Sequence, residues 1–265
     1  MSTATQVETI DLQRAGIPMS RLINVELRKL VDTRAGTWLL GSIGMLSAVV
    51  MVVLIWVLAA NDQIATFENF VGAMSTPMGI LLPVLGIMSV TSEWGQRTGL
   101  VTFTLEPRRS RIVIAKLVSS VIVAVMALVV SVAFGALGNV IFGLITGDDL
   151  IWNVSGLQLA GFFLLNVIGL ATGFAFGMLF MNTAAAIVLF FVYSFVLPGL
   201  FAAGAALMDW FKDLQPWIDF AHAQTPLFAA TMTGKDWSEF AVSGLIWFVL
   251  PLAIGIWRLL RAEVK

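Results

Sequence analysis

The chain has 265 residues, of which 59% are hydrophobic and only 12% charged, so it is too apolar to be a soluble domain that hides its apolar side chains in one core. The sequence contains no cysteine, which excludes a disulfide framework, thiol catalysis and a cysteine-ligated metal, and its single histidine, His222, cannot build a metal site alone. The net charge of −1 excludes little by itself, but the charges are distributed very unevenly along the chain.

The first informative segment runs from Ile17 to Thr37. Its apolar residues recur at helical spacing, whereas its charged residues fall largely elsewhere on the helical wheel. This pattern predicts a surface helix along the cytoplasmic face of a membrane, with its apolar side in the lipid boundary and its basic side towards anionic headgroups. The charged residues assigned to this surface helix are Glu26, Arg28, Lys29 and Arg34. The alternative is a charged lead-in that only orients the first membrane span.

Six later stretches contain no charged residue, and each has about the 20 apolar residues that a membrane-spanning helix needs. They are Trp38–Ala60, Ala73–Ser92, Leu117–Thr146, Gly156–Met181, Ala184–Met208 and Phe240–Trp257. We therefore expect an all-α polytopic membrane protein with a single domain. Its expected parts are a cytoplasmic N-terminal segment (1–36), a six-helix bundle (37–258) and a cytoplasmic tail (259–265). Membrane lipids are thus expected to surround it.

The charges outside these stretches predict the topology. If the N-terminus is inside, all basic residues except Lys212 and Lys235 lie on the inner side. The inner group is Arg14, Arg21, Arg28, Lys29, Arg34, Arg97, Arg108, Arg109, Arg111, Lys116, Arg258, Arg261 and Lys265. Because Lys and Arg near span ends stay in the cytoplasm, both termini are predicted to be cytoplasmic.

The connection between the second and third spans, Glu93–Arg111, is basic and contains an apolar centre from Leu100 to Leu105. Apolar residues outside a span need something to cover them. Two explanations remain open from the residues alone: this connection docks another protein, or it packs against the surface helix of the same chain.

This region resembles the first coupling helix of ABC-2 type exporter permeases, the transmembrane subunits of prokaryotic ATP-binding cassette transporters. The resemblance rests on an acidic residue, a Gly–Thr type turn, a short apolar segment ending in Leu, then Pro, basic residues and a lysine that begins the next helix. These residues are Glu93, Arg97, Thr98, Gly99, Leu105, Pro107, Ser110, Arg111 and Lys116. The run Glu26–Leu30, with Thr33, Arg34 and Trp38, is similar to the N-terminal surface helix of that family.

The resemblance implies that the connection docks an ATPase. The docking residues it implies are Glu93, Arg97, Gly99, Leu100, Phe103, Leu105, Pro107, Arg108, Arg109 and Arg111. The chain has no G-x-x-x-x-G-K-[ST] phosphate loop, so ATP and Mg²⁺ would be bound by a separate ABC ATPase subunit present in two copies. A second permease copy or a paralogue would complete an efflux unit in the inner or plasma membrane of a prokaryote.

Three glycines, Gly169, Gly173 and Gly177, lie on one face of the fourth span. Small residues at this spacing let helix backbones approach closely in lipid. Either packing within the bundle or a subunit interface would account for them, and packing within the bundle is the simpler explanation. Aromatic and charged residues then alternate around Ala205–Phe220, which predicts one or two short helices in or on the outer leaflet, where the resemblance implies a re-entrant element.

No nucleophile–base pair, carboxylate dyad or metal-ligand cluster is apparent in the sequence, so we expect no catalytic site, cofactor site or metal site in this chain. Nucleic-acid binding is not expected, because topology explains the basic residues. An uncharged membrane interior favours a hydrophobic or amphiphilic cargo, since a charged solute would lose its hydration without compensation. The alternatives to an exporter subunit are a non-transporting membrane sensor or assembly partner and, less well supported, a membrane-embedded lipid-modifying enzyme.

Overall fold

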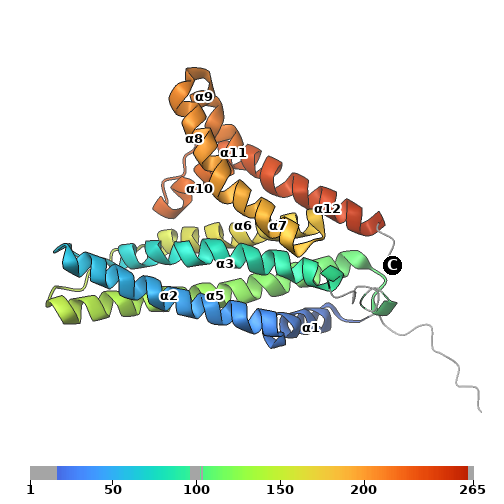
Figure 1. Cartoon of the computed structure of the whole chain (residues 1–265), viewed down its shortest axis with the longest axis horizontal. Helices are drawn as coiled ribbons and strands as arrows, with labels where there is room; N and C mark the ends of the chain where they lie inside the picture. The colour runs from blue at the N-terminus through green and yellow to red at the C-terminus, as the bar shows by residue number, and fades with distance from the viewer. Residues whose placement is uncertain (1–16, 96–101, 103, 262–265) are drawn as a thin grey trace, which may run out of the picture.

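The computed structural model describes residues 17–95, 102 and 104–261. In these residues every regular element is helical, and six helices or runs of helix are long and apolar enough to cross a membrane. The chain is therefore an all-α, multi-pass membrane protein, as the sequence predicts. Figure 1 shows a bundle of long helices and, at an angle to it, an arm that carries the last elements of the chain.

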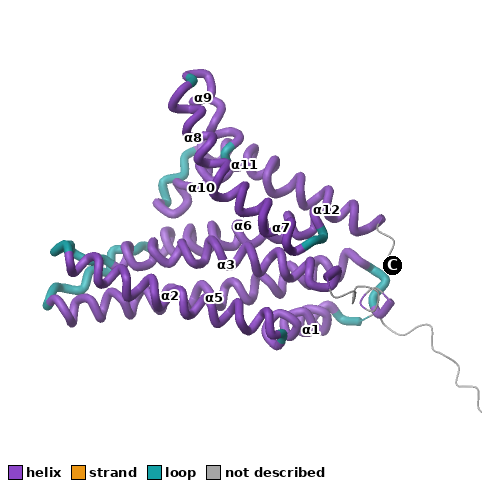
Figure 2. Tube along the Cα trace, in the orientation of Figure 1, coloured by secondary structure: helices purple, strands orange, loops and turns teal. Residues whose placement is uncertain are grey.

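The bundle is built from four long helices and one short helix that lies at its end. The helix α1 (Met19–Asp32) is followed by α2 (Arg34–Ala60), α3 (Phe67–Gly95), α5 (Arg109–Thr146) and α6 (Gly156–Phe180). Figure 2 shows the loops that connect α2 with α3 and α5 with α6 at one end of the bundle. The spans extend beyond the uncharged stretches of sequence because a helix continues into its polar ends, most clearly in α5, which begins at Arg109 rather than at Leu117.

The arm contains the fifth and sixth spans. The fifth consists of α7 (Thr183–Phe191), the π-helical turn η1 (Val192–Val196) and α8 (Leu197–Leu207). The sixth consists of α11 (Gly234–Gly244), the π-helical turn η2 (Leu245–Val249) and α12 (Leu250–Arg261). Between them lie two short helices, α9 (Asp209–Ile218) and α10 (Phe220–Ala229). The helix α9 falls within the predicted segment Ala205–Phe220, whereas α10 begins where that segment ends.

The helices α3 and α6 form the centre of the molecule, and glycine allows their backbones to touch. A Cβ atom added at Gly173 would lie 2.3 Å from the carbonyl oxygen of Pro83, and one added at Gly86 would lie 2.3 Å from that of Leu170. A Cβ at Gly177 would lie 3.0 Å from the carbonyl oxygen of Ile87, whereas Gly169 has more space. The glycine face of the fourth span therefore packs inside this chain, against α3.

The outer helix α10 packs beside α6 within the depth of the bundle. Its residues Ala223 and Leu227 are buried, and a Cβ atom at Gly161 would lie 2.1 Å from the Leu227 carbonyl oxygen. Gly161 is five residues into α6, or about 7 Å along the helix axis. The helix α10, which lies before the last span, thus runs along the flank of α6.

Candidate functional site: a charged junction at the basic end of the bundle

Three segments that are far apart in the sequence meet at the end of the bundle where α1 lies. They are α1, the last turn of α3 and the first turns of α5, and we call this place the charged junction. The chain turns sharply between α1 and α2, where the Thr33 hydroxyl accepts a hydrogen bond from the Gly36 amide at 3.1 Å. A Cβ atom at Gly36 would lie 1.7 Å from the Leu30 carbonyl oxygen, so this corner requires glycine. The corner fixes where α1 lies relative to the bundle.

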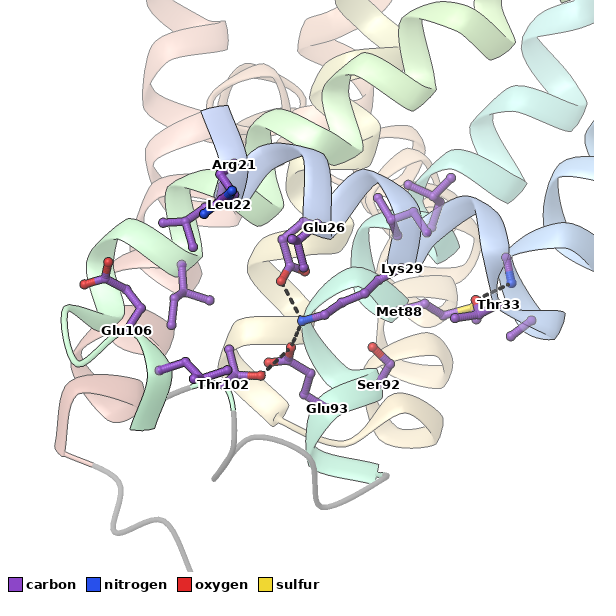
Figure 3. Close-up of a pocket in the computed structure, with 18 of the residues that line it drawn as sticks. Arg21, Leu22, Glu26, Lys29, Thr33, Met88, Ser92, Glu93, Thr102 and Glu106 are labelled. Atoms are coloured by element: carbon purple, nitrogen blue, oxygen red, sulfur yellow. Dashed lines mark hydrogen bonds and ion pairs between the residues drawn. The ribbon is translucent and has the colours of Figure 1, made fainter. Parts of the chain in front are cut away.

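Two carboxylates and two ammonium groups alternate in the charged junction. Figure 3 shows one of the ammonium groups, that of Lys29, between Glu26 and Glu93. The Lys116 Nζ atom lies 2.8 Å from Glu26 Oε2 and 3.1 Å from Glu93 Oε1. The Lys29 Nζ atom lies 2.7 Å from Glu26 Oε1 and 2.7 Å from Glu93 Oε1. Each charge thus touches two charges of opposite sign, and the four formal charges cancel.

Two further hydrogen bonds involve the charged groups of the junction. The Lys116 ammonium donates to the Ser89 carbonyl oxygen at 3.2 Å, and the Thr102 hydroxyl donates to Glu93 Oε1 at 3.1 Å. Glu26, Glu93 and Lys116 are all less than 8% exposed. Burying charges at this depth is tolerable only when they are paired and hydrogen-bonded. The junction therefore holds α1, α3 and α5 together.

Lys29 is the partly exposed member of the junction. Burial lowers the pKa of its ammonium group, but the hydrogen bonds and charges of Glu26 and Glu93 outweigh that effect and raise the pKa above the ordinary value of 10.5. Lys29 is therefore positively charged at neutral pH. Since both carboxylates are already occupied by lysine, the junction is arranged to join helices rather than to bind a metal ion.

A cavity of about 730 Å³ lies beside the junction, as Figure 3 shows. Its wall combines the charged groups with apolar side chains from α1, α2, α3 and α5, among them Leu22, Leu39, Leu85 and Ile112. The cavity lies between part of α1 and the bundle, while Leu27 and Leu30 of α1 pack against the hydrophobic core beside the charged positions.

The surface-helix residues differ in where they point. Arg28 and Arg34 are exposed, as expected for the basic side of a surface helix. Glu26 and Lys29 instead turn towards α3 and α5 and form ion pairs there, so these two members of the predicted surface-helix set also contact the bundle. The cause is that Glu93 and Lys116 offer partners of opposite sign.

The described docking residues divide into two groups. Glu93 belongs to the charged junction, Arg111 pairs with Glu106 at 2.6 Å and also donates to the Ile17 carbonyl oxygen, and Arg109 donates to the Leu259 carbonyl oxygen. The second group, Leu105, Pro107 and Arg108, is exposed. The predicted docking residues Arg97, Gly99, Leu100 and Phe103 lie outside the described residues.

Residue-by-residue reading of the sequence missed the roles of Glu106 and Lys116 as ion-pair partners. A signal for Lys116 does exist, because a lysine directly before an uncharged span must either reach water or find an acid. Comparison of the chain with protein-family models and with curated proteins found no match. The functional argument therefore rests on the residues and their geometry.

Proposed function

We propose that this chain is the transmembrane subunit of an ATP-driven exporter of hydrophobic or amphiphilic molecules. In this proposal both termini and the charged junction are cytoplasmic, in the inner or plasma membrane of a prokaryote. A separate ABC ATPase in two copies supplies the energy, and a second copy of the chain or a paralogue completes the unit. The resemblance of Glu93–Arg111 to a coupling helix motivates this assignment.

The observation that carries the proposal is the charged junction itself. It joins α1 to the ends of α3 and α5, the two spans that flank the basic connection. A force applied to this connection would therefore reach α1 and two spans together, and through α3 it would reach α6. A permease that is driven from outside the membrane needs such a rigid link between its docking surface and its spans.

The charges of the described spans favour an external energy source. The charged residues of α3 and α5 lie near the ends of these helices: Glu68 is in the first turn of α3, and the others are near the basic end, where lysine neutralises the acids Glu26 and Glu93. A transporter driven by an ion gradient needs ionisable groups along its path through the membrane. The central parts of the spans offer uncharged polar groups instead, so coupling to ATP hydrolysis explains the chain better than coupling to protons.

A matched pair of substitutions tests the docking assignment. Leu105 is 70% exposed at the basic end, and Ile64 is 67% exposed in the connection between α2 and α3 at the opposite end. We expect Leu105→Glu to reduce the ATPase that co-purifies with the tagged full chain from native membranes at least several-fold, whereas Ile64→Glu leaves it unchanged. Equal recovery of an ATPase with both variants, or an equal loss with both, would contradict docking at this surface.

A further inference from the structure

A second cavity of about 440 Å³ lies within the membrane-spanning part of the molecule, far from the charged junction. It is enclosed by α3, α6, the fifth span at η1, and α10. A volume of this size is typical of sites for small molecules. Phe195 lines the cavity and is 61% exposed on the outside of the chain, so the cavity reaches the membrane-facing surface.

The wall of this cavity is uncharged and mostly apolar, with a few polar side chains. Among the described residues that line it there is no Asp, Glu, Lys or Arg. Ile80, Pro83 and Phe190 supply apolar surface, while Asn166 and Gln224 supply amide groups. A charged ligand would lose its hydration here without compensation, so the cavity fits an uncharged molecule.

Three polar side chains of the wall donate hydrogen bonds to backbone carbonyl oxygens of their own helices. The Asn166 Nδ2 group donates to the Phe162 carbonyl oxygen at 2.8 Å, and the Thr172 hydroxyl donates to the Ile168 carbonyl oxygen at 2.8 Å. The Gln224 Nε2 group likewise donates to the Phe220 carbonyl oxygen at 2.9 Å. The backbone thus takes the Thr172 hydroxyl hydrogen and one N–H of each amide, and the oxygen atoms of these side chains can receive a hydrogen bond from a ligand.

One of these acceptors, the Asn166 Oδ1 atom, is buried without a hydrogen-bond partner among the described residues. Asn166 is 2% exposed, and its Oδ1 atom makes no hydrogen bond with any described part of the chain. A buried acceptor without a partner costs free energy that a bound donor would recover. Asn166 is also ten residues into α6, or about 15 Å along its axis, which places it near the middle of the membrane.

One π-helical turn of the arm, η1, lines the cavity, and the other, η2, contacts η1. Tyr193 of η1 lines it, and the Tyr193 ring lies 4.9 Å from the ring of Trp247 of η2. The Trp247 indole is held in turn by a hydrogen bond of 2.7 Å to the Ile218 carbonyl oxygen. Single π-helical turns are frequent at functional sites, because they redirect side chains within a helix.

From these observations we infer that the cavity binds an uncharged amphiphile that carries a hydrogen-bond donor, such as a phenol or an alcohol on an aromatic body. The donor group binds Asn166 Oδ1, and the apolar body lies against Pro83, Phe190 and Tyr193. The ligand enters from the membrane beside Phe195. That this ligand is the exported cargo rests on the proposed export function, whereas its binding in the cavity does not.

The test uses two probes that differ only in the donor: 4-bromo-1-naphthol and its methyl ether, 1-bromo-4-methoxynaphthalene. Bromine quenches indole fluorescence at short range, so binding next to Tyr193 quenches Trp247. With the purified full chain in detergent, we expect saturable quenching by the naphthol and about tenfold weaker binding of the ether. The saturable component disappears in Trp247→Phe, which identifies its source.

The substitution Asn166→Leu removes the acceptor, keeps the branched shape of the side chain and should abolish the preference for the naphthol over the ether. Asn139→Leu is the matched control, since Asn139 is also 2% exposed but lies on α5 outside the cavity, and it should keep the preference. Equal affinity for both probes, no saturable quenching by either, or an unchanged preference in Asn166→Leu would overturn the inference. Binding is measured without an ATPase, so a chain that binds the naphthol but recruits no ATPase would refute the export function alone.

Discussion

Lys116 and Glu26 lie 90 positions apart in the chain, and each explains how the other can be buried. An isolated ammonium group two turns into an apolar helix would be costly, and so would a carboxylate on the buried side of α1. Together with Glu93 and Lys29 they form a neutral cluster that a membrane protein can place at the boundary of the bilayer. The same cluster determines which face of α1 contacts the bundle.

Removal of Lys116 should be much more damaging than removal of an exposed charge. We expect Lys116→Met to leave Glu26 and Glu93 with too little positive charge and to lower the free energy of unfolding by about 3–5 kcal/mol. Arg28→Met, on the exposed side of the same helix α1, should change it by less than about 0.5 kcal/mol. Equilibrium unfolding in mixed micelles provides the comparison, and similar values for both variants would show that the junction contributes nothing special.

The contribution of Lys29 should depend on pH in a defined direction. Because its pKa is raised in the folded chain, the folded state holds this proton more tightly than the unfolded state does. The stabilisation is therefore complete below pH 10.5 and is lost as the pH rises through the raised pKa. The difference in Tm between the unchanged chain and Lys29→Met should stay constant from about pH 6 to 9 and shrink above that range. A difference that shrinks already between pH 6 and 9 would refute this assignment.

At the scale of elements, hydropathy predicts the six spans because each of them is a long uncharged run. It does not predict that α5 begins at Arg109, since the charges before Leu117 become compatible with the helix only through partners on other segments. It also does not predict the turns η1 and η2, whose residues Tyr193 and Trp247 pack against each other although they are far apart in the sequence. A local sequence pattern contains no information on which residues far apart in the chain form ion pairs or pack together.

The glycine face of α6 permits a sharp test of helix packing. We expect Gly173→Ala to force α3 and α6 apart, because the new Cβ would lie 2.3 Å from the backbone oxygen of Pro83, and to destabilise the chain by about 1–3 kcal/mol. Gly169→Ala on the same face should be tolerated, because the added Cβ would lie at an ordinary contact distance of 3.7 Å from a side-chain atom of Pro83. Unfolding midpoints of the two variants in one detergent make the comparison, and a larger effect at Gly169 would contradict the described packing.

At the scale of the whole molecule, the chain has a basic end and an acidic end. The basic end contains α1, the start of α5 and the end of α12, which lie at the same end of the molecule in Figure 1. The connection between α5 and α6, with Asp148 and Asp149, lies at the other end. The charge pattern of the sequence and the arrangement of the helices therefore agree, and the rule that basic ends stay inside predicts the orientation.

Because the sequence has no cysteine, single cysteines can report this orientation without a background signal. Ser110→Cys and Asp148→Cys place exposed thiols at the basic and acidic ends. We expect a membrane-impermeant maleimide to label Asp148→Cys in intact cells and to label Ser110→Cys only after the membrane is opened. Labelling of Ser110→Cys in intact cells would reverse the proposed topology and remove the basic end from the reach of a cytoplasmic ATPase.

The most direct test of the export proposal is ATP hydrolysis by the assembly that is purified through the tagged full chain from native membranes. We predict vanadate-sensitive hydrolysis that co-elutes with the chain, with an ATPase subunit carrying a phosphate-binding loop present in equal amount to the permease subunits. Intact chain that elutes with no ATPase and no hydrolysis would contradict the proposal that this chain is the transmembrane subunit of an ATP-driven exporter.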